Sequence, residues 1–128
     1  MQGNQKFFKC SLCGNIASLI DNKGTPMMCC GQKMAVLVPN VAEARTEKHL
    51  PAVSIEGDTI VVSVGSVPHP MEDEHYIGFV YVDTEQGGQR KSFKPGAEPR
   101  AVFSLSDGDK PIAVYAYCNL HGLWETVV

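Results

Sequence analysis

The fold can be worked out from a stretch near the end of the chain, Ile112-Ala113-Val114-Tyr115-Ala116-Tyr117-Cys118-Asn119-Leu120-His121-Gly122-Leu123-Trp124. In its first half, successive side chains are expected on opposite faces of a strand. Ile112, Val114 and Ala116 share one face, as in a strand with one buried face. Cys118 and His121 then follow at a spacing that lets both reach one metal ion from a single tight turn. Such a pair is weak by itself, so its meaning depends on the rest of the chain.

Similar strand patterns precede this stretch. With 112–117 they are predicted at 52–55, 59–64, 76–83, 89–93, 100–105 and 123–127, separated by turn signals such as the three-residue loop Glu56-Gly57-Asp58 and Gln86-Gly87-Gly88. Ala101, Phe103 and Leu105 alternate in the same way. About seven short strands at this spacing, without a sustained helical period, predict a β-sandwich.

The first 38 residues have a different character. They contain Cys10-Ser11-Leu12-Cys13-Gly14, a short β-like run at 16–20, a turn at 21–24 and the adjacent pair Cys29-Cys30. A segment this short cannot bury a core of its own, so something else must stabilise it. Four thiolates forming an S₄ site are the best candidate.

The second cysteine pair leaves the metal open. A zinc ribbon normally repeats Cys-x-x-Cys, whereas Cys29 and Cys30 are adjacent and force a different sulfur–metal–sulfur geometry. A structural zinc site therefore stays an alternative to iron, and a disulfide set is less favoured because adjacent cysteines bridge only with strain.

A linker is predicted around 38–46, where the sequence becomes polar and is interrupted by proline. It divides the chain into a small domain at 1–38 and a larger one at 39–128. A length of 128 residues suits one ordinary domain with a small appendage.

Composition narrows the functional classes. With 11 Lys and Arg against 14 Asp and Glu, the net charge of −3 argues against nucleic-acid binding. No apolar run is long enough for a membrane helix, and the first residues lack the apolar region of a signal peptide. We therefore expect a cytoplasmic protein, whose five cysteines are better interpreted as metal ligands or reactive thiols than as disulfides.

The four histidines complete a second possible metal site. They are expected at strand edges or in turns, and His69 is flanked by two prolines that fix its backbone. Four imidazoles and one thiolate suit iron better than zinc, because five donors leave one position open on a six-coordinate metal. The nitrogen donors would be His49, His69, His75 and His121, with Cys118 as the sulfur donor.

These motifs resemble the superoxide reductase family. The resemblance rests on Glu47-Lys48-His49, on Gly65-Ser66-Val67-Pro68-His69-Pro70-Met71 with the following His75, and on Cys118-Asn119-Leu120-His121-Gly122 with Trp124. The N-terminal cysteine pattern is similar to the desulforedoxin-like domain of the two-iron members, the desulfoferrodoxins. The likeness covers essentially the whole chain.

The resemblance implies a fold and two non-haem irons per chain. The fold would be mostly β, with a small rubredoxin- or desulforedoxin-like N-terminal domain and an immunoglobulin-like, seven-stranded antiparallel β-sandwich. One non-catalytic iron would be held by Cys10, Cys13, Cys29 and Cys30. The catalytic iron would be held by His49, His69, His75, His121 and, axially, Cys118.

The resemblance also implies an activity, the one-electron reduction of superoxide to hydrogen peroxide. Glu47 would occupy the sixth position of the oxidised site, and Lys48 would attract superoxide and help supply protons. An external donor such as rubredoxin would return the electron, and the protein would be a homodimer. Three alternatives are an electron-transfer protein using only the S₄ centre, a zinc-stapled interaction module and a superoxide dismutase.

Overall fold

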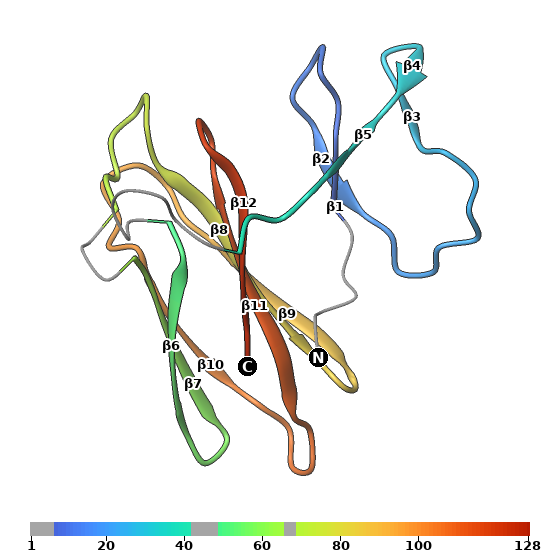
Figure 1. The fold of residues 1–128 in the computed structure, drawn as a ribbon. Coiled ribbons are helices and arrows are strands. Elements are labelled where there is room, and N and C mark those ends of the chain that lie inside the picture. The colour runs from blue at the N-terminus through green and yellow to red at the C-terminus, as the bar shows by residue number, and fades with distance from the viewer. Residues whose placement is uncertain (1–6, 42–48, 66–68) are drawn as a thin grey trace. The chain divides into compact units, whose positions relative to one another are not determined.

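A computed structural model describes residues 7–41, 49–65 and 69–128. Within these ranges the protein is entirely β, with twelve strands and no helix (Figure 1). The chain forms two compact units, and the boundary between them along the chain lies between Val38 and Pro39. The predicted mostly-β fold class is confirmed.

The N-terminal unit contains two small antiparallel sheets. In the first, β1 (Phe7–Lys9) lies between β2 (Ile16–Ser18) and β5 (Ala35–Leu37). In the second, β3 (Met28–Cys29) pairs with β4 (Gln32–Lys33). The β-like run predicted at 16–20 is two residues too long, because the ladder with β1 ends at the pair Phe7 and Ser18.

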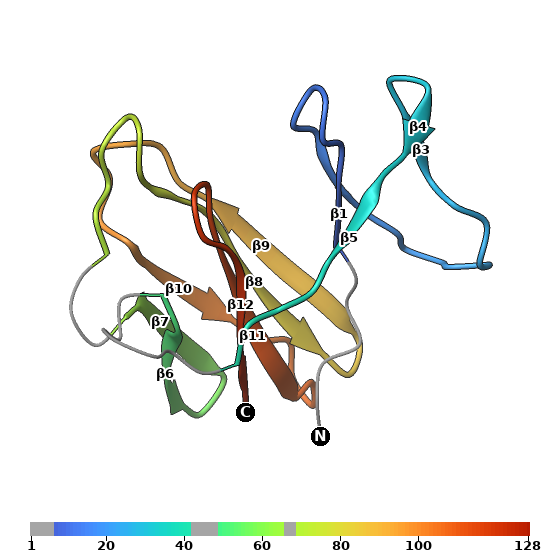
Figure 2. The same cartoon turned by 45° about the horizontal axis from the view of Figure 1, so that its top comes forward.

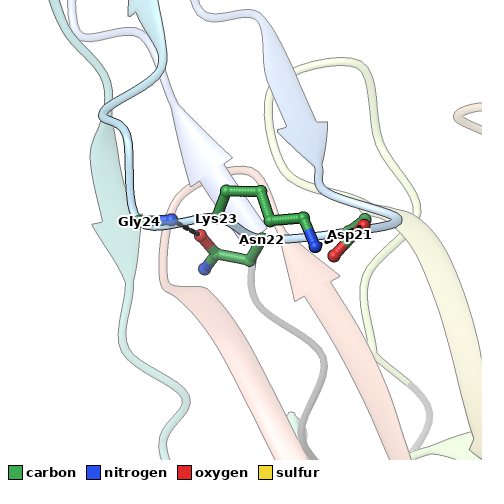
Figure 3. Close-up of polar contacts among 4 residues, drawn as sticks. All are labelled: Asp21, Asn22, Lys23 and Gly24. Carbon is green, nitrogen blue, oxygen red and sulfur yellow. Dashed lines mark hydrogen bonds and ion pairs between the residues drawn. The ribbon is translucent and has the colours of Figure 1, made fainter.

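The predicted turn at 21–24 is stabilised by its own side chains (Figure 3). The Asn22 side-chain oxygen accepts a hydrogen bond of 2.9 Å from the backbone N–H of Gly24, as expected for an Asx turn. Lys23 Nζ lies 3.1 Å from a carboxylate oxygen of Asp21. Both charged side chains are largely exposed, so this ion pair adds little stability.

The C-terminal unit is a sandwich of two antiparallel sheets (Figures 1 and 2). One sheet has the order β10 (Arg100–Ser104), β7 (Thr59–Val64), β6 (Pro51–Glu56). The other has the order β12 (Gly122–Val127), β11 (Pro111–Cys118), β8 (Ile77–Thr84), β9 (Gly87–Ser92). The predicted immunoglobulin-like sandwich of seven antiparallel strands is confirmed.

The core of the sandwich consists of alternate residues from the facing strands, including Val62, Val80, Phe103 and Val114. Burying each of these side chains contributes about 1.5–3 kcal/mol to folding. Ala101 and Leu105 are buried as predicted. Ile112 is only half-buried, whereas every residue from Ala113 to Cys118 is buried, so the predicted alternation with one buried face is wrong for β11.

Two predicted turns are each shorter than expected. Glu56 pairs with Thr59, so the β6–β7 loop has two residues rather than three. Gly87 and Gly88 belong to β9, where they pair with Thr84 and Asp83. A Cβ atom at Gly88 would lie 2.1 Å from the Tyr81 hydroxyl, so this glycine makes room for a packed tyrosine.

The start of the predicted linker is fixed to the sandwich rather than free. The Asn40 N–H donates to the Leu123 carbonyl at 2.9 Å, and the Glu125 N–H donates to the Asn40 carbonyl at 2.8 Å. Asn40 therefore extends the sheet beside β12. Residues 42–46 of the linker lie outside the described ranges. The described part of the chain contains no helix long and apolar enough to cross a membrane.

Candidate metal centres

The first candidate centre brings four sulfur atoms together in the N-terminal unit. The Sγ atoms of Cys10, Cys13, Cys29 and Cys30 lie within 4.8 Å of one another. Cys13 and Cys29 are 3.6 Å apart, and Cys29 and Cys30 are 4.0 Å apart. Sulfurs about 2.3 Å from a central ion at tetrahedral angles would be about 3.8 Å apart, so the set fits a metal ion with four thiolates.

A tight turn forms the first half of this centre. The Gly14 N–H donates to the Cys10 carbonyl at 2.9 Å, and the Cys13 N–H points at the Cys10 sulfur at 3.5 Å. Asn15 extends the pattern, since its backbone N–H lies 3.5 Å from the Cys13 sulfur and its side-chain amide 3.8 Å from the Cys29 sulfur. These donors stabilise thiolate charge.

The adjacent cysteines are explained by a two-residue hairpin. Cys29 pairs with Gln32, so Cys30 and Gly31 form the loop between β3 and β4. Both have positive φ, 52° for Cys30 and 75° for Gly31, as in a type I′ turn. A left-handed conformation is unusual for cysteine. This conformation lets the adjacent residues Cys29 and Cys30 direct both of their sulfurs to one point. The sequence pattern alone did not predict it.

The pKa values of two of these thiols are shifted in opposite directions, which favours a bound cation at this centre. The backbone N–H of Cys13 is the largest cause that lowers the pKa of Cys10, to about 6. Hydrogen bonding with the Cys13 side chain is the largest cause that raises the pKa of Cys30, to about 12. Four clustered thiols cannot all ionise without opposing charge. A metal ion supplies that charge.

The second candidate centre is assembled at one end of the sandwich. His49 precedes β6, His69 and His75 lie between β7 and β8, and Cys118 ends β11. His121 follows in the β11–β12 turn. The start of β6, the loop before β8 and the β11–β12 turn all lie toward the top of the sandwich in Figure 1.

The ligand atoms of this centre are close together. One nitrogen each from His49, His75 and His121 and the Cys118 sulfur lie within 4.8 Å of one another. His49 Nε2 is 2.9 Å from His121 Nδ1, near the separation of about 3.0 Å expected for two nitrogens at right angles about 2.1 Å from one metal. Cys118 Sγ lies 3.7 Å from His121 Nδ1. This set therefore fits a metal ion.

The His69 ring occupies the fourth corner of a square formed by the four imidazole rings. In the order His49, His69, His75, His121, neighbouring ring centroids are 4.9, 4.6, 5.1 and, on return to His49, 4.7 Å apart. The diagonal from His49 to His75 is 6.4 Å. Neighbouring rings are tilted by 66° to 81°, so each presents its edge to the next. The His69 ring thus completes the square, although its nitrogens are not in the set of ligand atoms that lie within 4.8 Å of one another.

The contacts of His69 determine which of its two ring nitrogens is available at the square of imidazoles. Its Nδ1 is 2.7 Å from the Pro70 carbonyl, so Nδ1 carries the proton and Nε2 keeps its lone pair. Nε2 is buried and has no hydrogen-bond partner among the described residues. Burial lowers the pKa of His69 to about 4, so the ring is neutral at neutral pH. A buried lone pair without a partner is what a metal would satisfy.

Cys118 and Trp124 form the inner wall of this centre. Cys118 is fully buried, and burial raises the pKa of its thiol, opposed by the backbone N–H groups of His121 and Leu120. Trp124 stacks on His49 with ring centroids 4.7 Å apart and planes 15° apart. Trp124, which closes the sequence motif of Cys118 and His121, is thus in direct contact with one imidazole.

The structure gathers every described residue that the sequence suggested for the two centres. Glu47 and Lys48, predicted to act beside the second centre, lie outside the described residues. Sequence reasoning missed Asn15, which reaches two of the four sulfurs, and Asn119, which forms hydrogen bonds to the loop that carries His75. The one signal in the sequence was proximity to a cysteine, since Asn119 directly follows Cys118 and Asn15 lies two residues after Cys13.

An all-β protein with an S₄ cluster in one unit and a His₄Cys cluster in the other defines a class, that of metalloproteins with two mononuclear centres. Two family descriptions match: desulfoferrodoxin at residues 41–127 and the desulfoferrodoxin N-terminal domain at residues 2–37. The chain belongs to the desulfoferrodoxin family.

Individual relatives agree with this membership. A desulfoferrodoxin from Syntrophotalea carbinolica is 41% identical over 119 residues, which cover 93% of each chain. A superoxide reductase from Pyrococcus horikoshii is 39% identical over 100 residues, covering 64% of this chain and 86% of its own. The crystal structure of the superoxide reductase from Treponema pallidum has 30% identity and a TM-score of 0.84, covering 96% of this chain and 98% of its own.

Proposed function

We propose that this protein is a superoxide reductase, which converts superoxide to hydrogen peroxide with one electron and two protons. The observation that carries the proposal is the square of four imidazoles with the Cys118 thiol beside it. Five donors leave a six-coordinate metal one position for a small molecule. The names of several relatives add support.

We assign the two ligand sets on the same grounds. His49, His69, His75, His121 and Cys118 would hold the catalytic iron, and Cys10, Cys13, Cys29 and Cys30 would hold a second, non-catalytic iron. Iron in the ferrous state would supply the electron for superoxide. The protein positions the imidazoles, excludes water behind Cys118 by burial, and stabilises the thiolate with the N–H groups of Leu120 and His121.

Lys48 and Glu47 would control access from the open side. Superoxide is an anion, whereas the chain as a whole carries a net charge of −3, so attraction must come from a local cation. Lys48 precedes the ligand His49 and is the cation we assign to this role, together with help in proton supply. Glu47 would close the sixth position in the oxidised protein.

An external donor, of which rubredoxin is an example, would return the electron after each turnover. We further propose a homodimer that acts in the cytoplasm, where the five thiols would remain reduced. The residues up to Val38 would form the domain of the non-catalytic iron, and the sandwich would be the catalytic domain.

The activity is tested by superoxide consumption in the presence of a reductant. Iron-loaded protein should remove superoxide with formation of peroxide and with consumption of the external electron. Turnover that continues without any reductant and releases oxygen would instead identify a dismutase. A protein that carries electrons but does not react with superoxide would identify an electron-transfer protein, and one purified colourless with zinc an interaction module.

The role of Lys48 is tested by Lys48→Ala. We expect the second-order rate with superoxide to fall about tenfold and its dependence on ionic strength to flatten, since steering by a local charge is screened by salt. Stopped-flow or pulse-radiolysis measurements at several salt concentrations would show this. Lys110→Ala is a matched control, because Lys110 precedes β11 at the end opposite Cys118. An unchanged rate and salt slope in Lys48→Ala would contradict steering.

A further inference from the structure

Asn119 makes an unusual set of contacts beside the second centre. It lies in the β11–β12 turn, between the ligands Cys118 and His121. Its side-chain oxygen accepts the Tyr76 N–H at 2.8 Å, and its side-chain nitrogen donates to the Glu74 carbonyl at 3.1 Å. Its backbone N–H donates to the Tyr76 carbonyl at 3.2 Å. One residue therefore holds the backbone on both sides of His75.

These bonds replace a sheet ladder that becomes irregular at this point. From Ala113 and Asp83 to Tyr117 and Phe79, strands β11 and β8 pair regularly, and the register then shifts so that Cys118 pairs with Ile77. Beyond Ile77, the bonds to Asn119 connect the segment at 74–76 to the end of β11. On its other side, His75 exchanges two backbone hydrogen bonds with Glu72, of 2.9 and 3.2 Å. His75 is thus held between two bonded turns.

An asparagine suits this position chemically. Tyr76 offers a donor and Glu74 an acceptor, and a side-chain amide presents one acceptor and one donor on a single carbon. A carboxylate would keep only the bond to Tyr76, and an alanine would keep neither side-chain bond. The backbone bond from the Asn119 N–H would survive in both variants. The two side-chain bonds can therefore be removed in steps.

We propose that Asn119 is a positioning residue that fixes His75 relative to Cys118 and His121. This inference rests on the proposed function only in taking these three residues as ligands of one metal. The Asn119 amide does not touch the metal; it sets the distance between two ligand-bearing segments, the turn at 72–76 and the turn at 118–122. Replacing a residue that orients a metal ligand without touching the metal typically lowers metal affinity or activity by about 10–100-fold.

The test uses the full-length, iron-loaded protein and two variants, Asn119→Ala and Asn119→Asp. In Asn119→Ala we expect the His₄Cys centre to lose iron to a competing chelator with about tenfold lower apparent affinity. The thiolate-to-iron charge-transfer band of the oxidised centre should also shift or weaken, because His75 no longer has one fixed position. Asn119→Asp should give an intermediate effect. The absorption of the S₄ centre should not change in either variant.

Gln86→Ala is the matched control, since Gln86 also has a side-chain amide, lies in the turn at the end of β8 opposite His75, and is exposed. It should leave both the band and the iron affinity unchanged. A merely structural role for Asn119 would lower the melting temperature with the band position and chelator competition unaltered, and this result would overturn the proposal. If Asn119→Ala does not fold, unchanged iron binding and spectrum in Asn119→Asp would overturn it equally.

The same measurements separate this inference from the proposed activity. None of them uses superoxide. A spectral shift and weaker iron binding in the variants would support the positioning role even if the wild-type protein failed to consume superoxide. Superoxide consumption by the wild type, with unchanged iron binding in both variants, would leave the activity standing and reject the role of Asn119.

Discussion

The two ligand clusters of this protein are built in opposite ways. The thiolate cluster is local: Cys13 and Cys29 are 16 residues apart, and the sulfurs are directed by two tight turns. The imidazole cluster is distant in sequence: His49 and His121 are 72 residues apart and meet only because the sandwich closes. We expect the first cluster to depend mainly on a bound metal for its stability, whereas the second is carried by a sandwich with a packed core.

The largest effect confined to one centre is expected from removing one ligand of the imidazole cluster. Cys118→Ser should abolish the thiolate-to-iron charge-transfer band and reduce superoxide consumption by more than about 100-fold, beyond the loss expected for a partner outside the ligand set. The S₄ absorption should remain, because its four sulfurs all come from the N-terminal unit. Visible and EPR spectra with a superoxide assay provide the check. Survival of the band would refute Cys118 as a ligand.

Cys13→Ser is the mirror-image control for this variant. It should disrupt the S₄ spectrum and leave superoxide consumption within about twofold of the wild type, since the two clusters share no residue. Complete loss of activity in a folded Cys13→Ser protein would contradict two independent centres.

A smaller effect is expected from a change in the sheet that carries Cys118. Gly88→Ala would place a Cβ 2.1–2.7 Å from three atoms of the Tyr81 side chain, and overpacking of this kind costs about 1–3 kcal/mol. The sandwich should therefore melt about 4–8 °C lower for each kcal/mol lost. Its melting can be followed by the band of the His₄Cys centre, with the S₄ absorption as an internal reference.

Gly78→Ala is the control for this change. Gly78 lies in the adjacent strand β8, and a Cβ there would make only an ordinary contact of 3.6 Å with the Tyr117 ring. We expect this variant to be neutral or slightly more stable. Equal destabilisation by both alanines would show that glycine flexibility, rather than space for Tyr81, matters at position 88.

The smallest effect concerns acid stability. Hydrogen bonds from the Thr84 side chain, and from the backbone N–H groups of Gln86 and Lys110, lower the pKa of Asp109. A carboxylate with a lowered folded-state pKa contributes stability above its unfolded pKa, near 3.9, and this contribution is lost as the pH falls through the folded value. Below about pH 4 the sandwich should therefore lose stability through Asp109.

Asp109→Asn tests this dependence. The variant should be less stable than the wild type at pH 7, and the difference should shrink as the pH falls below 4. Thermal unfolding between pH 7 and pH 3 would measure it. Asp107→Asn, in the same loop but exposed, is the control and should follow the wild type. A constant difference at all pH values would show that Asp109 does not act through its charge.

Local chemistry explains why much of this protein could be predicted. The Cys-x-x-Cys turn, the strand alternation at Ala101 and Phe103, and the Cys118–His121 spacing all depend on neighbours in sequence. Errors arose where a distant partner decides the outcome. Strand β11 is buried on both faces, and its Tyr115 and Tyr117 rings contact aromatic rings of β8. Gly88 was assigned to a turn although it pairs with Asp83 of the neighbouring strand.

Short segments of sequence were enough to predict the candidate ligand types, the two groups in which they occur and the seven strands that bring one group together. These depend on side-chain chemistry and on hydrophobic periodicity, which are properties of short segments. The order of the imidazole square, and the bonds from Asn119 to the backbone on both sides of His75, follow from tertiary contacts alone. Both join segments that lie far apart in sequence, since His49 is 72 residues from His121 and Asn119 is 45 residues from Glu74.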